Sequence, residues 1–550
     1  MRSDKVAQVR RAAARGLLAL GVTAALASCG PGGPTATADS AAPDATTSAA
    51  TSAPVVRTTD GAVRGTATRD GLRRFQGIPF AAPPVGSLRW RPPQPAHAWT
   101  GVRDATRPGP VCVQPDAPEM PSGLPQSEDC LTLNVTAPRR PPEPGKPRPV
   151  LVWMPGGGFV TGAGSVDDPS RLVKRGDMVV VTLNYRLGVF GFFAHPRLGA
   201  QGNFGLQDQL AALRWVHANI ARFGGDPGRI TLGGVSAGAM STCTLMTSPR
   251  ARGLFRQAIV QSGSCLTDFP AGGFGPGSGP VNGWQPLTTV QRTGRDLADR
   301  LGCRDVTCLR RLPARELVKH QAQFSIVAYG TNLVPRHPAE VFAAGKQTPV
   351  PLLQGTTRDE HVEFALGVYP DGLTSAQYRG LLRDAFGADT ARRVERRYPV
   401  RDFPSPMAAA ARMFSDRSWT CPAWRAARLH ARTAPTYSYL FDDEAAIPLS
   451  GHPLPAHVRP SVAHGADVPY LFDSVNAPPL TAAQRRLATR MVGYWARFVR
   501  SGDPNGPHAT PWPRMSLTSG GRSYALDLAP GPRRTDLDVS RQCGFWLNRA

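Results

Sequence analysis

Charged residues are scarce in this 550-residue chain: they make up 19% of it, and only five of the 64 basic residues are lysine. Gly and Pro contribute 57 and 55 residues. This composition excludes a coiled coil and predicts a globular body with long connecting loops. The formal net charge is +24, but the arginines are scattered, with no basic run and no recognisable nucleic-acid-binding module. We therefore expect no nucleic-acid partner.

Long hydrophobic runs are missing as well. The apolar segment 16–27 follows a stretch rich in arginine and is too short to span a bilayer. This layout is typical of a secretory signal peptide, which we expect over residues 1–28. The segment ends in Leu-Ala-Ser-Cys, which resembles the lipobox of bacterial lipoproteins and predicts lipidation of Cys29. An ordinary secretory signal with an unmodified cysteine is the alternative.

Large side chains are almost absent from residues 29–54, which consist mainly of Gly, Pro, Ala, Ser and Thr. Such a segment cannot bury apolar surface and is expected to act as a flexible tether. The folded domain is then expected over residues 55–550. Together with the signal peptide, the tether predicts an exported protein, either anchored by lipid in the bacterial cell envelope or extracellular.

No two cysteines show the C-x-x-C spacing of a zinc knuckle, so no structural metal is expected. If Cys29 is lipidated, eight cysteines remain, and an even count outside the cytoplasm predicts disulfides. Several small buried thiols are the alternative. Their spacing alone does not determine which cysteines pair.

The centre of the chain has the pattern of a strand, a sharp turn and a helix around Ser236. Apolar residues recur at three- and four-residue spacing over 206–222, which predicts a helix packed on a sheet. A short predicted strand, 229–232, then leads into Gly-Val-Ser-Ala-Gly at 234–238. In a nucleophile elbow the flanking glycines permit the tight turn and the serine hydroxyl is exposed. Ser236 is therefore the predicted nucleophile, with a simple Gly-rich turn as the alternative.

A second glycine-rich segment predicts an oxyanion hole. The apolar residues 150–154 run into three consecutive glycines at 156–158. A tetrahedral intermediate needs preorganised N–H donors, and glycine lets the backbone approach it closely. We expect the N–H groups of Gly157, Gly158 and Ala237 to serve as these donors.

Several segments, together with the elbow, resemble the type-B carboxylesterase family, which includes cholinesterases and bacterial para-nitrobenzyl esterases. They are Phe-Gln-Gly-Ile-Pro-Phe-Ala at 75–81, Leu-Arg-Trp at 88–90, Glu-Asp-Cys-Leu-Thr-Leu-Asn-Val at 128–135 and Gly-Asn-Phe-Gly-Leu-Gln-Asp-Gln at 202–209. The likeness extends from about Val55 to Trp546. It implies an α/β-hydrolase fold, with a mostly parallel central sheet flanked by helices on both faces, and an acid and a histidine that follow the serine in the chain.

The resemblance also assigns roles to residues after Ser236. It implies that Glu360, at the end of 355–360, is the acid of the triad, with Asp359 as the second choice. His464, in the family-like segment 462–472, is the implied base. Ser262 corresponds to a buried serine that supports the triad, or is simply a turn hydroxyl.

Three disulfides are implied by the resemblance: Cys112–Cys130, Cys303–Cys308 and Cys421–Cys543. A bond between Cys243 and Cys265 would be an additional pair that the resemblance does not support.

These residues predict a carboxylic ester hydrolase that acts on a small-molecule ester and needs no metal or organic cofactor. A lipase or thioesterase with the same triad is an alternative, and so is a non-catalytic extracellular binding module. The family commonly has glutamate where this chain has Val235, and the loop from Cys112 to Cys130 lacks Trp, Tyr and Phe. We therefore predict poor hydrolysis of choline esters. The Gly-rich run 270–285 is either a lid beside the pocket or a surface loop.

Overall fold

The computed structural model describes residues 53–474, 477–515, 524–527 and 532–547. The predicted signal peptide, Cys29 and nearly all of the predicted tether lie outside the described residues. Contacts divide the chain into Met1–Thr51 and Ser52–Ala550, and the fold is that of the second unit. Of its described helices, none combines the length and the apolar character needed to cross a membrane.

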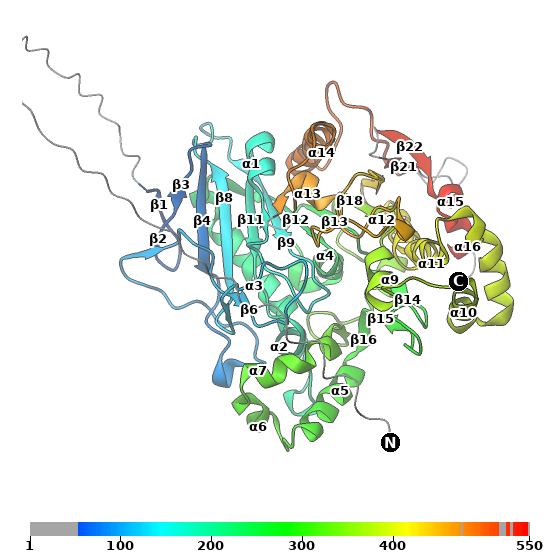
Figure 1. Ribbon diagram of the computed structural model, residues 1–550. Coiled ribbons are helices and arrows are strands. Elements are labelled where there is room, and N and C mark those ends of the chain that lie inside the picture. Colours follow the sequence, from blue (N-terminus) through cyan, green and yellow to red (C-terminus); the bar gives the residue numbers. More distant parts are fainter. Residues whose placement is uncertain (1–52, 475–476, 516–523, 528–531, 548–550) are drawn as a thin grey trace, which may run out of the picture. The chain divides into compact units, whose positions relative to one another are not determined.

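An 11-stranded sheet forms the centre of the described fold, in the order β22-β21-β19-β18-β13-β12-β9-β11-β8-β4-β3 (Figure 1). Its neighbouring parallel strands are β11 (Val179–Leu183), β9 (Arg148–Met154), β12 (Gly225–Val235), β13 (Gln257–Gln261), β18 (Leu352–Thr357), β19 (Thr436–Phe441) and β21 (Tyr524–Asp527). Antiparallel strands complete both edges: β8 (Thr132–Pro138), β4 (Leu72–Pro79) and β3 (Thr66–Ala67) on one side, and β22 (Arg533–Asp536) on the other. The mostly parallel sheet that the resemblance implied is confirmed.

Helices cover both faces of this sheet. Every residue of β9 is buried, as expected for a parallel strand packed on both sides. Successive side chains of a strand point to opposite faces, and those of β9 accordingly enter two different cores. Val150, Val152 and Met154 pack with residues of α3 (Phe204–Asn219) and α4 (Ala237–Thr247). Leu151 and Trp153 pack with residues of α1 (Ser170–Gly176) and α14 (Ala482–Ser501). The α/β-hydrolase architecture is therefore confirmed.

The helix and strand that the sequence predicted near the site are both present, but their lengths differ from the prediction. The predicted helix 206–222 is α3, followed by a 3-10 turn over Ile220–Phe223. The predicted strand 229–232 is the longer β12, which reaches Val235 because it pairs with β9 on one side and β13 on the other. This ladder carries the chain directly to Ser236.

The eight cysteines beyond Cys29 form four disulfides: Cys112–Cys130, Cys243–Cys265, Cys303–Cys308 and Cys421–Cys543. The structure therefore contains the three pairs that the resemblance implied and also the additional one. The additional bond ties α4, which follows Ser236, to the loop after β13. The bond of Cys421 ties α12 (Cys421–His430) to the C-terminal α16 (Cys543–Leu547).

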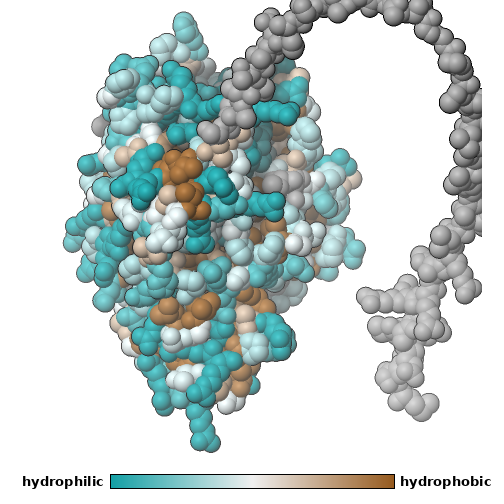
Figure 2. Space-filling view, turned by 90° about the vertical axis from the view of Figure 1, so that its left-hand side faces the viewer, coloured by the Kyte–Doolittle hydropathy of each residue, from teal (hydrophilic) through white to brown (hydrophobic). Residues whose placement is uncertain are grey.

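The face of the molecule shown in Figure 2 lies on the side of β3 and β4 in Figure 1 and is mainly hydrophilic. Hydrophobic residues on this face gather in small patches that hydrophilic residues separate. Scattered patches of this kind are ordinary for a protein surface.

Candidate active site

Ser236 lies on a sharp turn between β12 and α4, with backbone angles φ 56° and ψ −122°. A positive φ is rare for a residue with a side chain, and the surrounding structure must hold it. The two nearby glycines leave no room for a side chain. A Cβ on Gly238 would lie 2.1 Å from the carbonyl oxygen of Met154, and one on Gly234 would lie 2.6 Å from the carbonyl carbon of Gly238. The structure thus places Ser236 on the strand, turn and helix that the sequence predicted.

Glu360 and His464 come together although 104 residues separate them in the chain. Nδ1 of His464 lies 2.5 Å from Oε2 of Glu360. The other carboxylate oxygen, Oε1, accepts a hydrogen bond of 2.7 Å from the N–H of Thr357, and the Glu360 side chain is fully buried. One oxygen is therefore fixed by the backbone, and the other is left for the imidazole.

The second ring nitrogen of His464, Nε2, is buried and has no hydrogen-bond partner among the described residues. His464 and Ser236 both line one cavity of about 470 Å³. The rings of Trp419 and Phe364 pack against the imidazole, with centroid distances of 4.7 and 5.3 Å. Packing of this kind fixes the plane of the imidazole and leaves Nε2 available for the serine.

The glycine loop after β9 lines the same cavity. Gly157 and Gly158 have φ values of 102° and 59°, and a Cβ on Gly157 would lie 2.3 Å from the carbonyl oxygen of Thr161. The carbonyl of Gly157 accepts hydrogen bonds of 2.9 Å from the N–H groups of Val160 and Thr161. In the described part of the chain, no hydrogen bond uses the N–H of Gly157, Gly158 or Ala237. These three N–H groups are therefore free to bind a substrate oxygen.

The cavity combines apolar side chains with carboxylates. Met120, Val166, Phe364 and Leu449 contribute apolar surface. Three carboxylates, those of Glu119, Asp167 and Glu363, also line it. Among the described residues that line the cavity, none is Arg or Lys, in a chain whose formal charge is +24. Apart from His464, the ionisable side chains of the lining are therefore acidic, whereas the chain as a whole is basic.

Burial dominates the titration of Glu363, whose carboxylate accepts a hydrogen bond of 3.0 Å from Ser450. Burial raises the pKa of Glu363; the hydrogen bond and the charge of His464 oppose this rise, and the charge of Glu119 adds to it.

The run 270–285 contributes no residue to the described lining. It instead places Phe274 against Phe364, with ring centroids 6.0 Å apart.

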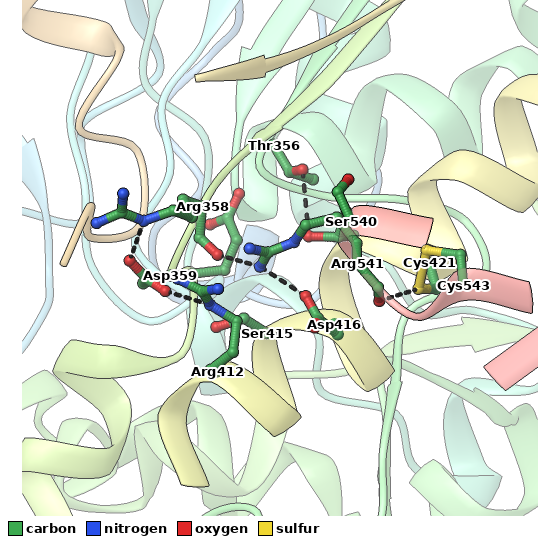
Figure 3. Close-up of polar contacts among 12 residues, drawn as sticks. Thr356, Arg358, Asp359, Arg412, Ser415, Asp416, Cys421, Ser540, Arg541 and Cys543 are labelled. Carbon is green, nitrogen blue, oxygen red and sulfur yellow. Dashed lines mark hydrogen bonds and ion pairs between the residues drawn. A yellow bond between two sulfur atoms is a disulfide. The ribbon is translucent and has the colours of Figure 1, made fainter. Parts of the chain in front are cut away.

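Two acidic residues near the triad have partners other than His464. The carboxylate of Asp359, the second choice for the acid, faces Arg358 and Arg412 (Figure 3). Asp467 accepts hydrogen bonds from the hydroxyl of Tyr439 and from Nε2 of Gln261, at 2.5 and 2.8 Å. Burial raises the pKa of Asp467 to about 6, opposed by the bond from Tyr439 and reinforced by the charge of Glu360. Of the candidate acids, Glu360 is the one in contact with the imidazole.

Ser262 is fully buried, with φ 50°, and its hydroxyl has no hydrogen-bond partner among the described residues. Among the described residues, its hydroxyl therefore makes no hydrogen bond with the triad. Sequence reasoning missed Trp419, Phe364 and Asp467 as neighbours of the site. Of these three, only Asp467 could have been found from the sequence, because it lies in the same family-like segment as His464. No cluster of His, Cys, Asp and Glu suited to hold a metal occurs within the residues described.

A nucleophilic hydroxyl on an elbow, an imidazole paired with a carboxylate, and unpaired N–H groups beside the serine are the parts needed for acyl transfer. Together with the mostly parallel sheet, they define a serine hydrolase of the α/β-hydrolase type. The chain belongs to the carboxylesterase family, whose sequence model matches residues 52–546.

Individual members of the family are similar to this chain over most of their length. The chain is 35% identical to the cocaine esterase of Oryctolagus cuniculus, over 89% of this chain and 94% of that protein. It is 34% identical to the para-nitrobenzyl esterase of Bacillus subtilis, over 82% of this chain and 91% of the relative. The solved structure of a thermophilic PNB esterase, 31% identical, superposes with a TM-score of 0.74 and covers 89% of this chain and 99% of its own. The carboxylic ester hydrolase that the sequence predicted is thereby confirmed as the class of this protein.

Proposed function

We propose that this protein hydrolyses small-molecule carboxylic esters through an acyl-enzyme intermediate on Ser236, with His464 as general base and Glu360 as its orienting acid. The observation that carries the proposal is the pair of His464 and Glu360, 2.5 Å apart, in the wall of the cavity that also holds Ser236. A base held by a carboxylate, next to a hydroxyl on an elbow, is the arrangement that activates a serine.

In the first step Nε2 of His464 takes the proton of the Ser236 hydroxyl as its oxygen attacks the ester carbonyl. The N–H groups of Gly157, Gly158 and Ala237 hold the oxyanion that forms. One such donor contributes a factor of about 10²–10³ to kcat in enzymes of this kind. The imidazolium then gives its proton to the departing alcohol, and a water molecule deacylates Ser236 by the same route.

Glu360 keeps its charge throughout and stabilises the imidazolium. Its fixed oxygen, bound by the N–H of Thr357 at 2.7 Å, holds the carboxylate in one orientation. The histidine therefore presents Nδ1–H to the acid and Nε2 to the serine.

The cavity supports a substrate of modest size, because its volume of about 470 Å³ lies within the range of small-molecule sites, roughly 300–1,000 Å³. The relatives named as cocaine esterase and para-nitrobenzyl esterase act on small organic esters of this kind. The carboxylates in the lining oppose the entry of anionic esters. We infer a preference for neutral or cationic esters over anionic ones, while hydrolysis of choline esters is still expected to be poor, because the loop from Cys112 to Cys130 offers no aromatic face to a quaternary ammonium.

A lipase or thioesterase would use the same residues, and the acyl-chain profile separates these activities. A non-catalytic binding module is the alternative from another class. The nucleophile, base, acid and oxyanion loop are all present in this chain, which favours catalysis over binding alone.

We also propose that the protein is exported and that Cys29 is lipidated after removal of residues 1–28. The four disulfides support an oxidising location. Mass spectrometry of the N-terminal peptide, isolated from the bacterial envelope, tests this proposal. An unmodified Cys29 in the mature chain would contradict lipidation and leave export standing.

Hydrolysis of para-nitrophenyl acetate, butyrate and palmitate by the wild type and by Ser236→Ala tests the function. We expect activity on the shorter esters, unaffected by chelators and lost in the variant. Full activity of a folded Ser236→Ala protein would refute the mechanism. Preference for palmitate would indicate a lipase.

A further inference from the structure

The acid and the histidine of the proposed triad arrive on separate loops that leave the sheet before they meet. The ladder between β18 and β19 ends with Thr357 opposite Phe441. One more backbone bond follows, from the N–H of Arg358 to the carbonyl of Phe441, at 3.0 Å. Among the described residues beyond this bond, no hydrogen bond of the β18–β19 ladder fixes the position of one loop relative to the other. A separate contact must therefore set the distance between Glu360 and His464.

Asp359 makes such a contact, and it does so through two hydrogen bonds to one residue. Its N–H donates to the carbonyl of Val462 at 2.9 Å. Its Oδ2 accepts a hydrogen bond from the N–H of Val462, also at 2.9 Å. Asp359 is the neighbour of Glu360, and Val462 lies two residues before His464. Both backbone polar groups of Val462 are thus bound directly beside the triad pair.

Two guanidinium groups hold the Asp359 carboxylate in place, as Figure 3 shows. Nε of Arg412, on α11 (Pro406–Phe414), donates to Oδ1 at 2.7 Å. Nε of Arg358 donates to Oδ2 at 2.9 Å, and the same arginine donates from Nη2 to the carbonyl of Pro460 at 3.1 Å. The side chain of Asp359 is only 4% exposed, so water competes little for these bonds.

Further contacts anchor the acid loop on its other side. Arg541 donates a hydrogen bond to the carbonyl of Arg358 and forms an ion pair of 2.6 Å with Asp416 (Figure 3). The N–H of His361, the residue after Glu360, donates to the hydroxyl of Ser415 at 2.9 Å. Burial opposes the ionisation of Asp359, but the charges of Arg412, Arg358 and Arg541 outweigh it and hold its pKa well below the usual range. Asp359 therefore stays anionic, and its bonds persist, over the working pH range.

We propose that Asp359 is a positioning residue of this enzyme, which binds Val462 and thereby sets the distance between Nδ1 of His464 and Oε2 of Glu360. This inference rests on the proposed function of the triad. It gives a role to a residue that the sequence offered only as a second choice for the acid. A displacement of about 1 Å between reacting groups costs about 100-fold in rate, so a contact beside both residues controls kcat.

A purely structural role is the competing explanation, because removal of one partner of a buried ion pair destabilises any protein. Asp208 offers a matched control. It is fully buried and accepts hydrogen bonds from Nη2, Nε and the N–H of Arg186, at 2.7, 2.8 and 3.1 Å. Within the described residues, the hydrogen bonds of Asp208 go to Arg186 and not to Glu360 or His464. Both aspartates therefore contribute to stability, and only Asp359 is placed to affect the triad.

The experiment compares Asp359→Ala, Asp359→Asn, Asp208→Asn and Ser236→Ala in the full chain, with para-nitrophenyl butyrate as substrate, well below the lowest Tm of the set. We expect Asp359→Ala to lose about 100-fold in kcat with little change in KM, because the substrate cavity is unaltered. Asp359→Asn keeps an oxygen that can accept from Val462 and is expected to lose less. Asp208→Asn is expected to lower Tm and keep a kcat near that of the wild type. The proton NMR resonance of the His464 Nδ1–H should move in the Asp359 variants and not in Asp208→Asn.

Equal retention of kcat in Asp359→Ala and Asp208→Asn would overturn the positioning role and leave Asp359 a structural residue. If Asp359→Ala does not fold, Asp359→Asn carries the comparison, because its uncharged amide loses the ion pairs with Arg358 and Arg412 that hold the contact to Val462 in place. A kcat equal to that of Asp208→Asn then again overturns the proposal. Failure of the proposed function shows separately, as full activity of Ser236→Ala.

Discussion

The two sides of the active site are held by different forces. The nucleophile side consists of the glycine loop at 156–158 and the elbow at 234–238, and backbone geometry fixes both. At the elbow, a Cβ on Gly238 would lie 2.1 Å from a carbonyl oxygen, so any side chain there would strain the turn. The acid and histidine side depends on buried or half-buried charged groups from distant segments, such as Asp359, Arg412 and Arg541. Steric exclusion thus builds one side, and electrostatic pairing builds the other.

This difference has consequences for how each side responds to change. A close-packed backbone turn has no titratable group, and its stability is insensitive to pH and salt. A buried ion-pair network responds to protonation, and loss of one partner leaves the other charge uncompensated. Substitutions should therefore separate the two sides by the kind of effect as well as by its size.

The largest expected effects on kcat come from substitutions in the triad itself, one on each side of the active site. Ser236→Ala removes the nucleophile and should lower kcat by about 10⁶-fold. Glu360→Gln keeps the shape of the acid but removes the charge that stabilises the imidazolium, and should lower kcat by about 10⁴-fold. Steady-state kinetics with para-nitrophenyl butyrate measures both losses. Equal losses in the two variants would contradict the separate roles of nucleophile and orienting acid.

The positioning role of Asp359 predicts the next effect, a loss of about 100-fold in kcat for Asp359→Ala. This loss tests whether the contacts of Asp359 set the positions of Glu360 and His464 and thereby affect kcat. The kinetic comparison with Asp208→Asn decides the outcome.

The nucleophile side could be predicted from the sequence because its determinants are local. The elbow and the glycine loop are each a contiguous segment, and the glycines that a tight turn requires can be read directly from the sequence. Glu360 and His464 could be placed only through the family resemblance, since 104 residues separate them. The bonds of Asp359 to Val462 and Arg412 depend on how loops and α11 pack in space. The same holds for the disulfide of Cys243 and Cys265, because spacing in the chain carries no information on such contacts.

On the charged side, the stability of the fold should depend on Asp467. Its pKa is raised to about 6 in the folded protein, with burial as the main cause, against an unperturbed value of about 3.9. The folded state therefore holds this proton to a higher pH than the unfolded state does. Asp467 costs stability as pH rises from about 4 to 6, and the cost of about 3 kcal/mol persists above that range.

Asp467→Asn tests this sign. The stability of the variant relative to the wild type should be highest at pH 7 and should fall as pH is lowered to 4, where the wild-type carboxyl is protonated. Urea unfolding at pH 4, 5, 6 and 7 measures the difference. A difference independent of pH would contradict the raised pKa.

On the nucleophile side, Gly238→Ala places a methyl group against the carbonyl oxygen of Met154. Overpacking of this kind costs about 1–3 kcal/mol, and the loss should not depend on pH because no charge is involved. Gly367→Ala is the matched control, since a Cβ there meets nothing within 4 Å and the residue lies in α9 (Val362–Val368). We expect the control to be neutral or slightly stabilising. Equal stability of the two variants in urea would show that the elbow can relax.

The smallest expected effect concerns the substrate, at the point where the two sides face the same cavity. Glu363 precedes Phe364 in the cavity wall and carries a carboxylate that burial makes easier to protonate. Glu363→Gln should lower the preference for 2-(dimethylamino)ethyl butyrate over the uncharged 3-methylbutyl butyrate by about fivefold, which corresponds to about 1 kcal/mol of charge interaction. The ratio of kcat/KM for the two esters measures this preference. In the wild type the preference should weaken as pH falls, because the raised pKa lets Glu363 take up a proton at higher pH than usual. Glu340→Gln, at an exposed position outside the cavity, is the control, and an equal change in both variants would show that general surface charge is responsible.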